Sequence, residues 1–157
     1  MNNITFTLNG KTASYDGSAT DRLLDALRDI YGMTSVKCGC KEGECGACAV
    51  LLDGTLINSC CVAMGAVEGS TVVTLEGYRE TERFAVLDKA FASVSAVQCG
   101  FCIPGMVLAA ESVLAKNPNP TEAEVRDGIS GNLCRCTGYN AIVNAILIAS
   151  KEGNGLW

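Results

Sequence analysis

The chain has 157 residues, a net charge of −5, ten cysteines and no histidine. This length fits one ordinary domain or two small ones, and the acidic balance argues against a nucleic-acid partner, because phosphate binding needs clustered Lys and Arg. The lack of histidine excludes Rieske centres, zinc sites with His ligands and every catalytic triad that uses an imidazole base. Any metal is therefore expected to be held by sulfur.

The first residues contain no basic segment followed by an apolar core, and no apolar run approaches the ~18 to 20 residues that a membrane span requires. Ten cysteines in a secreted protein would suggest disulfides. Without signs of export, we expect a cytoplasmic protein with reduced cysteines and no membrane span.

Two antiparallel strands are expected at residues 4–8 and 11–15, because apolar and polar residues alternate there and Asn9-Gly10 forms a favoured hairpin turn. A helix is expected next, capped by Ser18 or Thr20 and ending near Gly32. Its apolar residues stand at helical spacing: Leu23, Leu24, Leu27 and Ile30.

Three cysteines, Cys40, Cys45 and Cys48, then follow in the order C-x4-C-x2-C, the plant-type ferredoxin spacing for a 2Fe–2S cluster. Glycines between them permit close approach of the backbone to an inorganic sulfide, which a Cβ would exclude. A fourth thiolate is needed, and Cys60 or its neighbour Cys61 follows after a short hairpin.

That hairpin is predicted from strands at 49–52 and 55–58, joined by an Asp-Gly turn that brings Cys60 back beside Cys48. A last strand at 71–75 completes a small mixed sheet on one helix, the β-grasp arrangement of plant-type ferredoxins. A charged, aperiodic stretch then indicates a boundary between a ferredoxin-like domain over 1–77 and a second domain over 78–157.

The second domain is expected to be a four-helix bundle, which makes the fold class α+β. Its first helix has one apolar face, and its second runs from Pro104 to Lys116. The third opens with a capping box at Thr121 and ends near residue 129, and the fourth spans residues 139–150. The apolar face of the first helix comprises Phe84, Leu87, Phe91 and Val94.

Two cysteine pairs, one at 99 and 102 and one at 134 and 136, each stand just before a predicted helix N-terminus. Free backbone N–H groups and the positive end of the helix dipole favour an anionic iron–sulfur centre there. If the two ends converge, four thiolates make a second 2Fe–2S site. Considered alone, the same cysteines would also suit a structural zinc ion, since sulfur ligation does not separate zinc from iron.

Taken together, these motifs closely resemble the small iron–sulfur subunit of molybdenum hydroxylases, the xanthine dehydrogenase family. That family also includes aldehyde, carbon monoxide and nicotinate dehydrogenases. The resemblance rests on residues 40–48 with Cys60, on QCGFC at 98–102 and on GNLCRCTGY at 131–139. It covers nearly the whole chain in the right order.

The resemblance implies a role for eight of the cysteines. Four would ligate an outer cluster nearer a flavin: Cys40, Cys45, Cys48 and Cys60. Four would ligate an inner cluster nearer a molybdopterin: Cys99, Cys102, Cys134 and Cys136. It also implies that Gln98 contacts the pterin and that the pterin hydrogen-bonds to the sulfur of Cys136.

The chain departs from the family pattern at three positions, none of which is a ligand. Ile103 stands where Thr is common, and Cys38 and Cys61 stand where other, frequently apolar, residues occur. We interpret these two cysteines as spectator thiols, with a ligand swap as the alternative. Gln98 could instead cap a helix or satisfy the backbone. For the first four cysteines, a zinc site or disulfides are the alternatives.

The resemblance implies electron transfer within a hetero-oligomeric oxidoreductase that acts on C–H bonds. In the family, water-derived oxygen enters the substrate at a molybdenum centre on a molybdopterin-binding subunit. Two electrons then leave singly through the clusters to FAD in a partner subunit. We expect no catalytic residue on this chain, which has no convincing nucleophile–base pair, and an N-heterocycle such as nicotinate or a purine as substrate.

Three rival classes of protein make different demands. A free-standing soluble ferredoxin would need no pterin-facing Gln98. An iron–sulfur redox sensor that regulates transcription would need a basic recognition helix, which this acidic chain lacks. A zinc-stabilised interaction module would contain zinc in place of iron.

Overall fold

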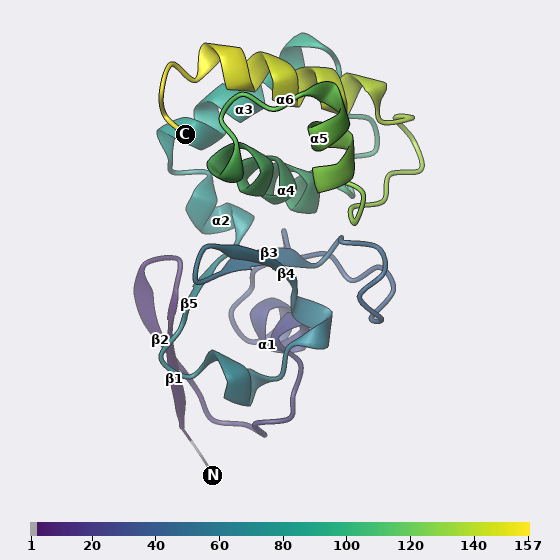
Figure 1. Cartoon of the computed structure of the whole chain (residues 1–157). Helices are drawn as coiled ribbons and strands as arrows, with labels where there is room; N and C mark the ends of the chain where they lie inside the picture. Colours follow the sequence, from purple (N-terminus) through teal and green to yellow (C-terminus); the bar gives the residue numbers. More distant parts are fainter. Residues whose placement is uncertain (1–2) are drawn as a thin grey trace.

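The computed structural model describes residues 3–157 and consists of a sheet-containing half and a helical half, one stacked on the other (Figure 1). This matches the mixed α and β content expected from the sequence. The sheet half contains the five strands found within residues 3–157, and the short helix α2 (Leu75–Tyr78) leads from it into the helical half.

Two tight hairpins form the sheet as predicted. The first joins β1 (Ile4–Leu8) to β2 (Lys11–Tyr15), and the second joins β3 (Ala49–Leu52) to β4 (Thr55–Asn58). Both turns place two residues at positive φ, and Asn-Gly and Asp-Gly tolerate that conformation best. With β5 (Thr71–Val73) between the hairpins, the strand order is β2-β1-β5-β3-β4, and β1 and β5 run parallel.

Helix α1 (Leu23–Asp29) packs its apolar face into the core of the sheet half, together with Phe6, Val50 and Val72. The predicted cap by Ser18 or Thr20 is wrong, because the helix begins after Arg22 with no side-chain cap. Long-range backbone pairing holds this end instead, since Leu23 N donates to the carbonyl of Val62 at 2.8 Å. Ile30, expected on the apolar face, is 60% exposed.

The segment after the sheet also differs from prediction. The last strand ends at Val73, two residues early, because Leu75–Tyr78 turns into helix α2. The side-chain oxygen of Asn9 accepts from Thr74 N at 2.9 Å, which ends the strand beside the first hairpin turn. Short 3-10 turns, η1 (Ser59–Cys61) and η2 (Met64–Val67), carry the chain from β4 to β5.

Four further helices build the other half: α3 (Glu82–Ser93), α4 (Ile103–Lys116), α5 (Glu122–Gly128) and α6 (Asn140–Glu152). The capping box at Thr121 and Glu124 is present as predicted. Helix α4 is buried along most of its length, and it packs against β3, so that Leu51 belongs to the core of the helical half. In the described part of the chain, no helix is long and apolar enough to cross a membrane.

Candidate metal centres

The first site comprises Cys40, Cys45, Cys48 and Cys60. The first three lie on the loop before β3, and the β3–β4 hairpin returns the chain so that Cys60 lies beside Cys48, as predicted. Two hydrogen bonds fix this return, because Ser59 donates both its N–H, at 3.3 Å, and its hydroxyl, at 2.8 Å, to the carbonyl of Cys48.

Backbone N–H groups give the first site its electrostatic character. The N–H groups of Glu42, whose N lies 3.4 Å from the Cys40 sulfur, and of Cys45 lower the pKa of Cys40 to about 7. Burial raises the pKa of Cys48 to about 11. The loop therefore directs N–H donors to the sulfur of Cys40 and shields the sulfur of Cys48 from water. This arrangement suits an anionic centre.

The second site comprises Cys99, Cys102, Cys134 and Cys136. Cys102 is the N-cap residue of α4, and the other pair lies on the loop before α6, so both pairs precede helix N-termini as predicted. The sulfurs of Cys99 and Cys136 lie 3.5 Å apart. Burial raises the pKa of Cys102 to about 12. Burial also raises that of Cys134, but donors from Thr137 and Cys136 lower it further, to about 7.

The thiols of both sites interact in pairs. In the first site, hydrogen bonding to the Cys45 thiol also shifts the pKa of Cys40, and hydrogen bonding to the Cys60 thiol also shifts the pKa of Cys48. In the second site, hydrogen bonding to the Cys134 thiol also shifts the pKa of Cys102, and the sulfurs of Cys99 and Cys136 are in contact. Within residues 3–157, no three potential ligand side chains gather around a single point. A binuclear cluster takes two thiolates at each iron, and two thiol pairs per site fit that requirement.

The two sites adjoin through their loops. Leu133 N donates to the carbonyl of Cys45 at 2.9 Å, and the buried Asn132 side chain donates to the carbonyl of Gly46 at 3.1 Å. A Cβ on Gly46 would lie 2.3 Å from the carbonyl oxygen of Gly131, so only glycine permits this approach. Sequence reasoning missed Asn132, and the only local signal was a polar residue inside the second cysteine motif.

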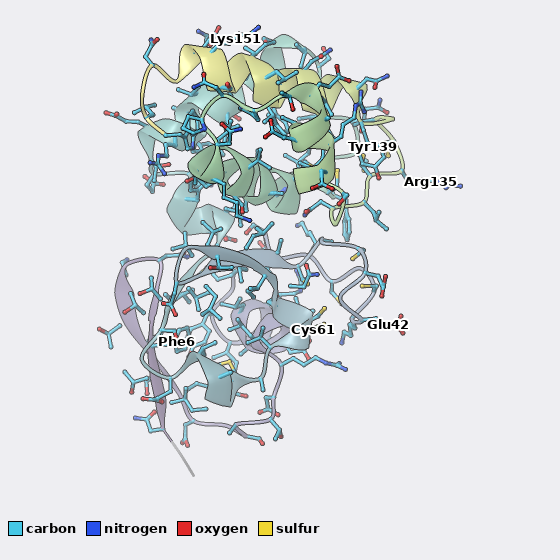
Figure 2. All side chains as sticks on the ribbon, viewed as in Figure 1. Phe6, Glu42, Cys61, Arg135, Tyr139 and Lys151 are labelled. Carbon is cyan, nitrogen blue, oxygen red and sulfur yellow. The ribbon has the colours of Figure 1, made fainter. Side chains whose placement is uncertain are left out.

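Both loops lie on the same side of the molecule. In Figure 2, the labelled Glu42 on the first loop and Arg135 on the second both extend outward there. Gln98, implied as a pterin contact, is exposed beside Cys99. Around the second site, three apolar side chains are about half exposed: Val97, Phe101 and Leu133.

The two additional cysteines, Cys38 and Cys61, are exposed. The sulfur of Cys61 lies 3.7 Å from that of Cys60, and this contact raises the pKa of Cys61. None of the ten cysteines, all of which the structure describes, forms a disulfide, so the disulfide alternative for the first site is not what the structure contains.

A buried carboxylate that the sequence analysis overlooked supports the helical half. Glu111, 6% exposed in α4, accepts hydrogen bonds from the Tyr78 hydroxyl at 2.6 Å, the Trp157 indole at 2.6 Å and Arg83 at 2.7 Å. These bonds tie α2, α3 and the last described residue to α4. A single charged residue inside the apolar run of 103–114 was the available signal.

Two family models match the chain. One, described as a 2Fe-2S iron-sulfur cluster binding domain, matches residues 6–71, which contain the first site. The other, described as a 2Fe-2S binding domain, matches residues 74–147, which contain the second.

Curated relatives of the same length are similar throughout. The nicotinate dehydrogenase small FeS subunit of Eubacterium barkeri is 48% identical over 154 residues, 97% of this chain and 98% of the relative. The xanthine dehydrogenase iron-sulfur-binding subunit of Escherichia coli O157:H7 is 45% identical over 147 residues, 92% of each.

Solved structures agree in fold. The structure of aldehyde oxidoreductase from Desulfovibrio desulfuricans superposes with a TM-score of 0.92 and 39% identity over 99% of this chain, which spans 17% of that much longer chain. Quinoline 2-oxidoreductase from Pseudomonas putida 86 superposes with a TM-score of 0.89 and 42% identity, over 98% of this chain and 96% of the other.

Proposed function

The chain belongs to the family of iron–sulfur subunits of molybdenum hydroxylases. We infer that it passes electrons singly, through its two 2Fe–2S clusters, from a molybdopterin centre in one partner subunit to FAD in another. Its relatives are iron–sulfur subunits of oxidoreductases, and the chain acts as such a subunit within a multi-subunit enzyme. Each cluster, when bound, accepts and releases one electron. The observation that carries this proposal is the presence of two adjoining sites, each made of two thiol pairs.

The four cysteines of each site are proposed as the cluster ligands. In the first site, which we assign to the outer cluster, one iron would be held by Cys40 and Cys45 and the other by Cys48 and Cys60. In the second site, assigned to the inner cluster, the pairs are Cys99 with Cys136 and Cys102 with Cys134. The contact between the Cys99 and Cys136 sulfurs, and the pKa shifts that hydrogen bonding between the other paired thiols causes, support this division.

The surface around the inner site is proposed to dock on the molybdopterin-binding subunit. Val97, Phe101 and Leu133 give it an apolar character, which suits a surface that a partner covers. Gln98 is exposed on the same segment, where its amide is available to a pterin, and Cys136 is exposed as well. A free-standing ferredoxin would have no need of this apolar rim.

The proposed substrate of the whole enzyme is an N-heterocycle, nicotinate or a purine. The 48% identity to a nicotinate dehydrogenase subunit supports this choice, as does the 45% identity to a xanthine dehydrogenase subunit. The proposed location is the cytoplasm.

We also propose a β-grasp ferredoxin-like domain over residues 1–77 and a four-helix-bundle domain over 78–157. The family matches over 6–71 and 74–147 support a boundary near helix α2.

The test is iron and acid-labile sulfide analysis, with EPR of the dithionite-reduced protein purified without oxygen. About four irons and four sulfides per chain, with two distinguishable 2Fe–2S signals, are expected. Co-purification with molybdopterin- and FAD-containing subunits is also expected. Zinc in place of iron would overturn the electron-transfer function, and a protein that carries both clusters but never binds a partner would be a free ferredoxin.

A further inference from the structure

Three hydrogen bonds enclose Cys134, one of the proposed inner-site ligands. The Thr137 hydroxyl donates to the Cys134 sulfur at 3.1 Å. The Tyr139 N–H donates to the same Thr137 oxygen at 3.2 Å. The Tyr139 hydroxyl in turn accepts from the Cys134 N–H at 2.8 Å, which closes a ring over six residues.

The ring fixes the direction of the bond to sulfur. A threonine hydroxyl has one proton, and because its oxygen already accepts from Tyr139 N–H, the proton is left for the sulfur. Tyr139 holds this geometry from an uncommon left-handed backbone conformation, with φ of 70°. A non-glycine residue in that conformation persists only where its surroundings hold it, and the Tyr139 hydroxyl bond to Cys134 N–H is such a constraint.

A hydrogen bond to a ligand sulfur changes the reduction potential of the cluster. Reduction adds one negative charge to an iron–sulfur centre, so a donor to sulfur stabilises the reduced form more than the oxidised form. In the first site, the Ser59 hydroxyl donates to the backbone carbonyl of Cys48, at 2.8 Å. At Cys40 the donor is the backbone N–H of Glu42, which no side-chain substitution removes.

We propose that Thr137 raises the reduction potential of the inner cluster by donating its hydroxyl proton to the sulfur of Cys134, and that Tyr139 holds the hydroxyl in this orientation. This inference rests on the proposed function, in which Cys134 is a cluster ligand. Thr137 acts through Cys134, so it is a positioning residue. By making the inner cluster easier to reduce, it favours acceptance of an electron from the molybdopterin side.

The experiment is an EPR-monitored redox titration of the full chain with both clusters, comparing the wild type with Thr137→Val. Valine has nearly the same shape but no hydroxyl. At a fixed potential, the ratio of reduced to oxidised inner cluster should fall about tenfold, a shift of about 59 mV for a one-electron couple. The outer cluster is the internal control, and its potential should not move.

Thr137→Ser is the conservative variant, because it keeps the hydroxyl and removes only a methyl group. It should retain the wild-type potential of the inner cluster. An inner potential that is unchanged in Thr137→Val, or that shifts equally in Thr137→Ser, would overturn the proposal.

Thr137→Ala serves as a second hydroxyl-free variant if Thr137→Val does not load its inner cluster. If both fail to load while Thr137→Ser loads normally, the hydroxyl serves assembly and the tuning role is wrong. The proposed function is tested separately by iron content: about four irons per chain in the wild type support it whatever the titration of the variants reveals.

Discussion

The first site takes three of its four thiols from the single loop 40–48, whereas the second takes two thiols from each of two separate loops. A backbone N–H group donates a hydrogen bond to the sulfur of Cys40, while a side-chain hydroxyl donates one to the sulfur of Cys134. A site made by one loop depends on local backbone shape. A site made by two depends on the side chains and helices that bring those loops together, so the two sites should fail for different reasons.

Removing one ligand from each site is the strongest test of this separation. Cys48→Ala should abolish the first cluster and Cys102→Ala the second, so iron falls from about four to about two per chain in each case. The EPR signal that survives identifies the site that was lost. Cys38→Ala is the control, since this exposed thiol belongs to neither proposed set and should leave the iron content unchanged. Loss of both signals from either ligand variant would mean that the sites do not form independently.

Gly46→Ala tests the close approach between the loops of the two sites. The new Cβ would lie 2.3 Å from the Gly131 carbonyl oxygen, at a backbone φ of +69°. Strain and overlap together should lower the free energy of unfolding by about 4 kcal/mol, measured by urea unfolding. Gly54→Ala is the matched control, because Gly54 has a φ of +79° but nothing within 4 Å of its Cβ position. Its cost should be about 1 kcal/mol, from backbone conformation alone. Equal costs would disprove the close approach.

Glu111→Gln tests how far the helical half relies on one buried side chain. Glutamine keeps an acceptor for Tyr78 and Trp157 but loses the charge that pairs with Arg83 at 2.7 Å. The free energy of unfolding should fall by about 2 to 3 kcal/mol, and the second cluster should be lost at lower urea concentrations than the first. Simultaneous loss of both clusters, followed by absorbance and EPR, would contradict this order.

Tyr78→Phe is the mildest change and adds a pH dependence. Burial, and then the hydrogen bond to Glu111, raise the pKa of Tyr78 above its usual value near 10. A raised pKa in the folded state means that the stabilisation is complete below about pH 10 and is lost as the pH rises further, since the unfolded chain releases the proton first. The wild type should therefore be more stable than Tyr78→Phe by about 1 kcal/mol at pH 8. This advantage should shrink by pH 11 in thermal unfolding followed by circular dichroism, and parallel profiles would contradict it.

Local sequence signals predicted both hairpins and one helix start. Asn9-Gly10 and Asp53-Gly54 predicted both hairpins, and Thr121 with Glu124 predicted a helix start, because each depends on neighbouring residues alone. The family resemblance implied two sets of four thiols, and their role as cluster ligands stays a prediction; the structure brings the Cys99 and Cys136 sulfurs of one set within 3.5 Å.

What the sequence did not predict depends on contacts between distant segments. Arg22 replaces Ser18 or Thr20 at the start of α1 because Leu23 pairs with Val62, 39 residues later in the chain and just after η1. Asn132 is a loop residue whose partner, the Gly46 carbonyl, comes from the other half of the chain. Such pairs leave no periodic trace in either segment.

The bond from Leu133 to Cys45 and the bond from Asn132 to Gly46 also bear on how the protein matures. Each loop loses conformational freedom when it binds its cluster, and this loss of entropy opposes cluster binding. Whichever site is filled first holds its own loop in place and, through these two bonds, lowers the entropy that the neighbouring loop still has to lose. Filling one site should accordingly make filling of the other more favourable, although each site can still be filled alone.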